Sequence, residues 1–168
     1  MGQGGRGDTP HVVMTSSAGF SDREIADRLA IQDLIARYAV IIDSRDFDAL
    51  DALFTPDARI DFTTFNGPVG SLTEIKAFLA ASLPLFTRSQ HMMGLPLIDL
   101  DEDAAHARTS CNNPMISTRS DGTTSVWLIG LWYEDDLVRT AEGWRFSVRN
   151  QIRSYTITGL ADTSLGAQ

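Results

Sequence analysis

The sequence predicts an α+β fold in which N-terminal helices wrap a curved, mostly antiparallel sheet and leave a pocket between them. The segments with helical caps and helical periods lie before residue 84, whereas the second half reads as strands separated by polar turns. Helices that cover one side of such a sheet are typical of α+β proteins. The length, 168 residues, suffices for one sizeable core and is too short for two.

The composition excludes several classes of protein. With 43% hydrophobic and 21% charged residues, the chain has the balance of a globular domain. No window approaches the run of about 20 apolar residues that a membrane helix needs. The formal net charge of -8, without a basic patch, disfavours nucleic-acid binding because it repels the phosphate backbone. A single cysteine cannot form an internal disulfide, and a reducing cytoplasm is the expected compartment.

Three segments are expected along the chain. Residues 1–20 are rich in glycine and show neither a helical nor a strand period, so we expect a flexible tail there. This tail also lacks the basic start and the apolar run of a secretory signal. Residues 21–157 hold all the predicted elements and form the domain, and residues 158–168 are expected to be a C-terminal tail.

The first helix is predicted to begin after Ser21. Ser21 and Glu24 have the spacing of a capping box, in which each side chain binds the backbone N–H group of the other residue. Apolar residues then recur close to the helical period, and the pattern ends near residues 43–44. The positions expected to face the core are Ile25, Leu29, Ile35, Tyr38 and Ile42.

Shorter elements follow this helix. A second, short helix is expected over residues 46–54 and is stopped by Pro56, which cannot continue it. A strand is expected over residues 58–65. Another capping box begins at Ser71 and opens a helix that Pro84 ends.

The rest of the chain is predicted to form four strands in an antiparallel meander. The strand segments cover residues 89–100, 104–118, 123–139 and 144–156, and polar or glycine-containing turns separate them. These strands supply most of the predicted sheet.

The third of these segments is apolar at nearly every position from 126 to 133. A strand with one face in water should alternate between apolar and polar residues, so both faces are expected to be covered. We expect the helices on one face and another subunit on the other, with Trp127 and Leu128 as outward residues. Coverage by the termini of the chain itself is the alternative.

Asp43 is a candidate general base. It follows an apolar run at the C-terminal end of the first helix, where both the helix dipole and burial would raise the pKa of its carboxyl group. A base that works near neutral pH benefits from such a shift. A solvated aspartate in the turn 43–46 is the alternative.

His91 is the second candidate, because imidazole titrates near neutral pH and can shuttle protons. A buried histidine bonded to a carbonyl group is the alternative. His106 follows an acidic turn and is expected to be exposed, and His11 lies in the tail. Neither makes a metal-ligand spacing with His91, and there is no second cysteine, so no metal site is expected.

Tyr38 could donate a hydrogen bond to a substrate carbonyl group from the inner face of the first helix. A core tyrosine with a satisfied hydroxyl group is the alternative. Tyr38 and Asp43 are five residues apart, which places them about 140° apart around a helix. Spacing alone therefore does not bring them into one pocket.

Other polar residues lie on the predicted strands. Asn113 shares a strand face with Thr109 and Cys111 by alternation, so it could line the pocket, while Cys111 is expected to be a small core residue. Arg149 and Arg153 could bind an acidic group of a substrate, or could form surface ion pairs.

Several motifs resemble the SnoaL-like branch of the nuclear transport factor 2-like superfamily, over about residues 22–155. The motifs are Ile42-Asp43-Ser44-Arg45-Asp46-Phe47-Asp48, Leu53-Phe54-Thr55-Pro56-Asp57-Ala58, Thr87-Arg88-Ser89-Gln90-His91-Met92-Met93-Gly94, Leu131-Trp132-Tyr133 and Gly143-Trp144-Arg145-Phe146. The resemblance implies a conical fold, with a curved sheet and N-terminal helices around a pocket.

Scytalone dehydratase and bile acid 7α-dehydratase are better-understood members, and both eliminate water beside a carbonyl group without a cofactor. By this resemblance, the catalytic residues fall on Tyr38, Asp43 and His91. The Asp43–His91 pair would supply the base, with Asp43 ionised and hydrogen-bonded to His91, and Tyr38 would donate to the enolate oxygen. The resemblance also implies a homo-oligomer, with a trimer ahead of a dimer.

The chain departs from scytalone dehydratase at four pocket positions. Ile42 and Phe62 stand where that enzyme has tyrosines, Thr109 where it has a histidine, and Ile129 on or near its asparagine. The pocket is therefore expected to be more apolar and to suit a steroid-, terpenoid- or polyketide-like ligand. The predicted substrate-binding residues are Phe62, Thr109, Asn113, Ile129 and Arg149.

Several functions remain open from the sequence. The same three groups could run a dehydration, a double-bond shift or a cyclisation. A non-catalytic binding or assembly domain is an alternative from another class. A small subunit of a ring-hydroxylating dioxygenase also fits the fold, but it would need a large metal-bearing partner.

Overall fold

The computed structural model describes residues 19–160, and the greater part of both predicted tails lies outside this range. The helical segments are α1 (Asp22–Ser44), η1 (Phe47–Ala52), η2 (Thr63–Phe65), α2 (Leu72–Ser82) and η3 (Leu83–Leu85). The strands are β1 (Phe54–Asp61), β2 (Val69–Gly70), β3 (Arg88–Ser89), β4 (Met92–Met93), β5 (Leu97–Asp101), β6 (Ala104–Thr118), β7 (Thr124–Thr140) and β8 (Gly143–Leu160).

The eight strands of the described residues form one sheet, in the order β2-β1-β8-β7-β6-β3, with β4 and β5 also paired to β6. Strands β5 to β8 pair antiparallel in sequence, so the predicted meander is confirmed. Strand β1 joins the edge parallel to β8, which makes the sheet mixed. The strand predicted over 89–100 is instead three short pieces on β6, because Gly94 and Pro96 interrupt it.

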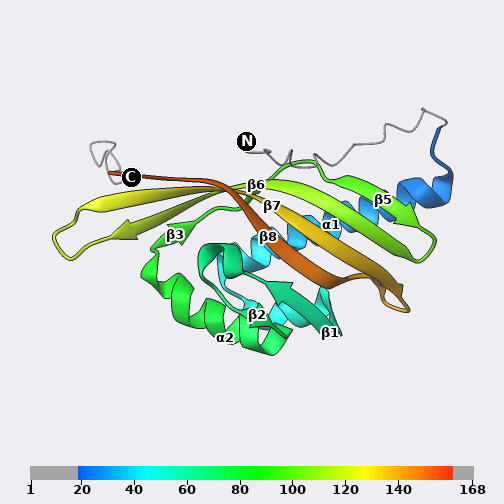
Figure 1. The fold of residues 1–168 in the computed structure, drawn as a ribbon, viewed down its shortest axis with the longest axis horizontal. Coiled ribbons are helices and arrows are strands. Elements are labelled where there is room, and N and C mark those ends of the chain that lie inside the picture. The colour runs from blue at the N-terminus through cyan, green and yellow to red at the C-terminus, as the bar shows by residue number, and fades with distance from the viewer. Residues whose placement is uncertain (1–18, 161–168) are drawn as a thin grey trace, which may run out of the picture.

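The long strands β6, β7 and β8 make up most of the sheet (Figure 1). The pairing of β7 with β8 shifts register between Gly130 and Leu131 and again between Asp136 and Leu137. Such irregularities bend and twist a sheet. Helix α1 contacts β8 while α2 contacts β1, so the helices and the bent sheet enclose the core.

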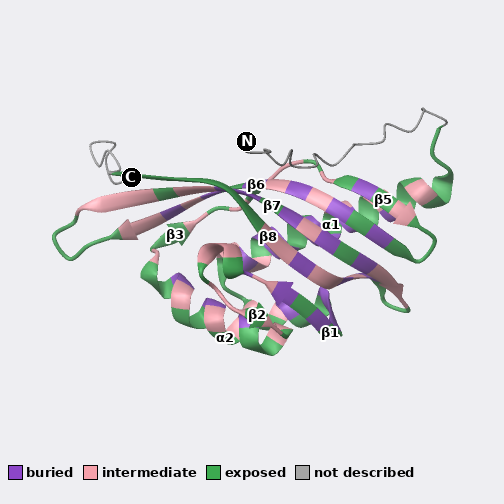
Figure 2. Ribbon diagram, in the orientation of Figure 1, coloured by how far each residue is buried: buried purple, intermediate pink, exposed green. Residues whose placement is uncertain are grey.

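Burial alternates along the long strands (Figure 2), as expected for a sheet with one face on a core. The buried core combines residues from α1, η1, α2 and every long strand, including Ile35, Leu50, Ile60, Ile75 and Phe146. None of the helices among residues 19–160 is long and apolar enough to cross a lipid bilayer.

Helix α1 begins and ends as predicted. Ser21 and Glu24 form both bonds of the capping box, and the helix ends at Ser44, before Arg45 in the left-handed conformation. The predicted inward face is wrong in the first turns, where Ile25 and Leu29 are exposed. The helix is fixed there by the buried carboxylate of Asp27, which accepts hydrogen bonds from Arg139 and Trp144.

The region after α1 also differs from the prediction. Phe54 and Pro56 belong to β1, not to a helix and its stop. Pro56 has no backbone N–H group to donate. The parallel pairing of β1 with β8 is irregular between Phe54 and Arg59, so the proline costs the strand few hydrogen bonds.

Trp127 faces the interior side of the sheet, contrary to the prediction that it points outward. Its ring lies 5.8 Å from the ring of Phe86 in an edge arrangement. Because side chains alternate along a strand, Leu128 lies on the opposite face.

Candidate functional site

A cavity of about 360 Å³ opens between α2, the second half of α1 and the inner face of β6 to β8. Its walls are mainly apolar and aromatic. The apolar lining consists of Tyr38, Ile42, Phe62, Phe65, Phe78, Leu79, Leu83, Phe86, Met115, Trp127, Ile129 and Leu131. Polar side chains are few, which is typical of a small-molecule site.

His91 lies in the buried part of this cavity, with a side chain only 6% exposed. Its Nδ1 atom lies 2.7 Å from Oδ1 of Asp43. Its Nε2 atom lies 3.1 Å from Nδ2 of Asn113. The predicted hydrogen bond between His91 and Asp43 is therefore present, and the imidazole is held at both nitrogens.

Asp43 reaches His91 from the end of α1. Its Oδ2 accepts a 2.7 Å hydrogen bond from the backbone N–H group of His91, and its Oδ1 accepts one of 2.9 Å from Ser89 Oγ. Burial alone would raise the pKa of Asp43, but the bonds from His91 and Ser89 outweigh it and lower the pKa below its ordinary value. The raised pKa predicted for Asp43 is thus wrong, and the carboxylate holds the His91 ring and backbone by hydrogen bonds.

The hydrogen bonds indicate which nitrogen of His91 carries the proton. An ionised Asp43 carries no proton, so the neutral imidazole donates from Nδ1 and its Nε2 lone pair accepts from the Asn113 amide. The Oδ1 atom of Asn113 is buried without a partner among the described residues. The Nε2 lone pair is therefore open to a substrate proton only when the Asn113 amide group has moved away from it.

Tyr38 lines the same cavity, one helical turn before Ile42. It is buried, and its ring makes an edge contact with Tyr133 at 5.7 Å. Burial raises the pKa of Tyr38, against the opposing charge of Arg149, so the phenol keeps its proton at neutral pH. A protonated phenol is a hydrogen-bond donor.

Arg149 does not line the cavity, contrary to the prediction for a substrate-binding residue. It is fully buried, and Nε and Nη2 each donate a 2.7 Å hydrogen bond to the carboxylate of Asp135. Its guanidinium group lies 3.9 Å from the ring centre of Tyr38, 4.4 Å from that of Tyr133 and 4.0 Å from that of Phe146. Burial alone would lower the pKa of Arg149, but Asp135 raises it, so the charge is permanent.

The other predicted pocket residues divide into two groups. Phe62, Asn113 and Ile129 line the cavity, whereas Thr109 is fully buried and does not. Cys111 is buried, and burial raises the pKa of its thiol to about 12, which makes it a core residue and no nucleophile. His106 is exposed on the sheet, between Asp136 and Glu134.

Sequence reasoning missed Ser89 and several cavity residues. Ser89 and His91 are two residues apart in the strand predicted over 89–100, so alternation there could have indicated the bond of Ser89 to Asp43. Phe65, Phe78, Phe86 and Trp127 come from four different parts of the chain, and only the folded protein brings them together.

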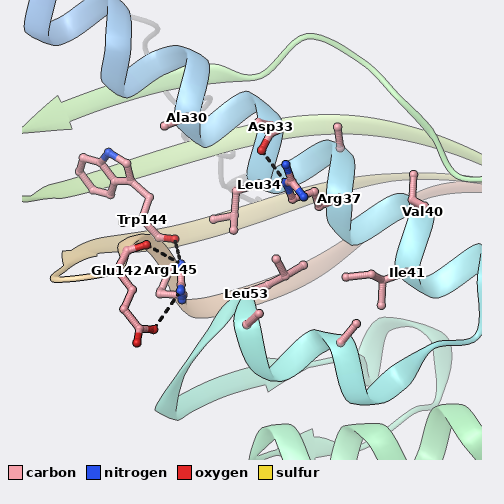
Figure 3. Close-up of a pocket in the computed structure, with 14 residues that line it drawn as sticks. Ala30, Asp33, Leu34, Arg37, Val40, Ile41, Leu53, Glu142, Trp144 and Arg145 are labelled. Carbon is pink, nitrogen blue, oxygen red and sulfur yellow. Dashed lines mark hydrogen bonds and ion pairs between the residues drawn. The ribbon is translucent and has the colours of Figure 1, made fainter.

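A second, larger depression of about 810 Å³ lies on another face of α1 (Figure 3). Its charged groups already satisfy one another: Asp33 accepts from Arg37 at 2.6 Å, and Glu142 accepts from Arg145 at 3.2 Å. It contains no histidine among its lining residues, so the smaller cavity is the better candidate for acid–base chemistry. Within residues 19–160, no cluster of three potential metal ligands occurs.

Comparison with known proteins gives consistent matches. A family model described as "SnoaL-like domain" matches residues 23–150. The uncharacterized protein Rv2910c of Mycobacterium tuberculosis is 42% identical over 132 residues, which cover 79% of this chain and 88% of that protein.

Solved structures also match. The Kfla4162 protein of Kribbella flavida has a TM-score of 0.73 and 29% identity, covering 80% of this chain and 95% of that one. A protein of Novosphingobium aromaticivorans, provisionally described as a scytalone dehydratase, has a TM-score of 0.71 and 20% identity, covering 81% and 89%. The hexachlorocyclohexane dehydrochlorinase LinA-type3 of Novosphingobium barchaimii has a TM-score of 0.69 and 18% identity, covering 82% and 94%.

Proposed function

Because the chain belongs to the SnoaL-like family, as the sequence resemblance predicted, we propose that its cavity performs acid–base chemistry. The reaction is an elimination of water or a double-bond shift in a small, apolar molecule that carries a carbonyl group. One observation carries this proposal: His91 is buried at the cavity between Asp43 and Asn113, and Tyr38 lines the same cavity. Protein side chains supply each proton transfer.

The steps follow from the protonation states. Nε2 of His91 takes a proton from the carbon next to the carbonyl group, and the C–H electron pair forms the enolate. Tyr38 donates a hydrogen bond to the enolate oxygen, while Asp43 stabilises the imidazolium ion. When the enolate collapses, the C–O bond to a β-hydroxyl group breaks, and His91 returns its proton so that water leaves.

Two structural neighbours support an elimination. By their names, the Novosphingobium aromaticivorans protein is assigned to the removal of water and the LinA-type3 enzyme to the removal of HCl. Each reaction needs a base that takes a proton from carbon. The cavity of this chain offers one such group among its lining residues, His91.

The Tyr38→Phe variant tests the proposal. It keeps the ring contacts and removes one hydroxyl group, so the melting temperature should stay nearly unchanged. Loss of an enolate donor should cost about 2.7–4 kcal/mol of transition-state stabilisation, or roughly a hundred- to a thousandfold in rate. The assay is deuterium exchange beside the carbonyl group of 2-tetralone in D2O, followed by NMR.

Other outcomes point to other functions. Unchanged exchange in Tyr38→Phe, with a lower melting temperature, would identify a core tyrosine and contradict the mechanism. Tight binding of 2-tetralone by the wild-type protein without any exchange would indicate the alternative function, a non-catalytic binding domain.

We also propose that the chain forms a homo-oligomer, with a trimer ahead of a dimer, through the outer face of the sheet. Trp132, Ile152, Tyr155 and Ile157 are all more than a third exposed on β7 and β8. An apolar face of this kind favours contact with a second copy of the chain.

The Ile152→Glu variant should dissociate this assembly, because a buried, unpaired charge costs several kcal/mol. Light scattering of the wild-type protein and the variant at micromolar concentration measures the effect. Thr73→Glu, at an exposed position of α2, is the control and should not alter the mass. A monomeric wild-type protein would contradict this assignment.

A further inference from the structure

Arg153 places a positive charge at the solvent-exposed side of the cavity. It lines the cavity together with Asn66, Gln151 and Thr156, and its guanidinium group lies 5.8 Å from the ring centre of Phe65. Arg153, Asn66 and Thr156 are exposed, whereas His91 and Asn113 lie in the buried part. The cavity therefore has a buried end with the acid–base pair and an open end with a cation.

The charge of Arg153 is not neutralised within residues 19–160. Its backbone N–H group donates to Thr64 Oγ1, but its side chain makes no ion pair there. Six other arginines form ion pairs with carboxylates: Arg23, Arg37, Arg108, Arg139, Arg145 and Arg149. Arg28, Arg45, Arg59, Arg88 and Arg119 also lack such a pair within these residues, but they do not line the cavity.

No aspartate or glutamate of the described chain lines the cavity either. The protein nevertheless has 22 acidic residues and a formal net charge of -8. The general field of such a protein repels anions, so a local, unopposed guanidinium group is what would admit one. Its planar donors match the two oxygens of a carboxylate, and Asn66 and Gln151 offer further amide donors.

We infer that the ligand of this cavity is an apolar molecule with an anionic group, a carboxylate, and that Arg153 selects it. The apolar body lies among the aromatic rings, the carboxylate meets Arg153 at the open end, and the reactive carbonyl group reaches His91. Of these three contacts, only that of the carbonyl group with His91 rests on the proposed function. The selection of a carboxylate is a binding property and needs no turnover.

The experiment compares two isosteric ligands that differ in charge. N-phenyl-1-naphthylamine reports on the cavity by its fluorescence, and 2-naphthoate and neutral 2-naphthamide compete with it. Wild-type protein should bind 2-naphthoate about tenfold more tightly than the amide, as expected for a charge-assisted hydrogen bond. In Arg153→Gln this preference should disappear, because the carboxylate loses its charged partner and binds no more tightly than the amide.

One control shows that the dye binds in the cavity, and a second shows that the preference for 2-naphthoate depends on Arg153. Energy transfer from tryptophan to the dye should fall in Trp127→Phe, because Trp127 lines the cavity. Arg119→Gln removes an arginine that lies outside the cavity and should leave the preference intact. The inference would be overturned if Arg119→Gln and Arg153→Gln lost the preference for 2-naphthoate equally, or if Arg153→Gln kept it.

Failure here is distinct from failure of the proposed function. If the protein binds 2-naphthoate no more tightly than the amide but needs His91 for deuterium exchange, the cavity is catalytic and the ligand is not selected by its carboxylate. If the protein prefers 2-naphthoate to the amide but does not catalyse deuterium exchange, Arg153 still selects the ligand and the proposed proton transfer by His91 is wrong.

Discussion

Replacing His91 with alanine should reduce deuterium exchange by roughly a hundred- to ten-thousandfold, the contribution of a general base. The melting temperature should change little, because the His91 side chain is held mainly by hydrogen bonds. Asp43 keeps its hydrogen bonds from the His91 backbone N–H group and from Ser89 Oγ, so its carboxylate still has partners in the variant. NMR exchange rates and thermal unfolding measure the two effects.

His106→Ala is the matched control for this variant. His106 also contacts carboxylates, those of Asp136 and Glu134, but it is exposed and does not line the cavity. Its replacement should leave exchange at the wild-type rate. Normal exchange in His91→Ala would contradict the proposed base, and unfolding of that variant would identify a structural histidine.

The lowered pKa of Asp43 gives this site a defined dependence on pH. A carboxylate with a depressed pKa contributes stability that is present above its unfolded value of about 3.9. That contribution is lost as the pH falls through the lower, folded value. The small difference in unfolding free energy between the wild-type protein and His91→Ala should therefore be present at neutral pH and vanish at strongly acidic pH. Urea denaturation of both proteins over a series of pH values measures it.

Replacing Arg149 with methionine should lower the free energy of unfolding by about 3–5 kcal/mol, because the buried charge of Asp135 is left without its partner. The three aromatic rings around Arg149 also lose their interaction with the cation. Urea denaturation monitored by tryptophan fluorescence measures the change.

The double variant Arg149→Met with Asp135→Leu separates the charge from the packing. Removing both charges leaves no unpaired ion, and apolar replacements of buried ion pairs are often neutral or stabilising. The double variant should therefore recover most of the stability that Arg149→Met alone removes. A single variant that is destabilised by less than about 1 kcal/mol would show that the pair is solvated.

Local signals predicted the two α-helices. The capping boxes at Ser21 and Ser71 are properties of neighbouring residues, and both are present. The end of α1 near Asp43 followed from the apolar pattern. The contact of Asp43 with His91 needed the family resemblance, because 48 residues separate the two.

What could not be predicted depends on strand register. Asp135 and Arg149 lie directly opposite each other on β7 and β8 only because the pairing shifts where it does. Asn113 meets His91 because β4 pairs with β6 at Asn112. A shift of one residue would turn each of these side chains to the other face of the sheet. Composition and periodicity carry no information about such shifts.

The carboxylate of Asp43 accepts from the hydroxyl group of Ser89 and binds His91 through both its backbone and its side chain. This contact joins the last turn of α1 to the edge of the sheet, where β3 and β4 are only two residues long. Such short edge strands open at a smaller free energy than the long central strands. A local opening that separates this edge from α1 would therefore dismantle the acid–base pair while β6 to β8 remain folded. Loss of activity on heating or in mild denaturant should precede global unfolding.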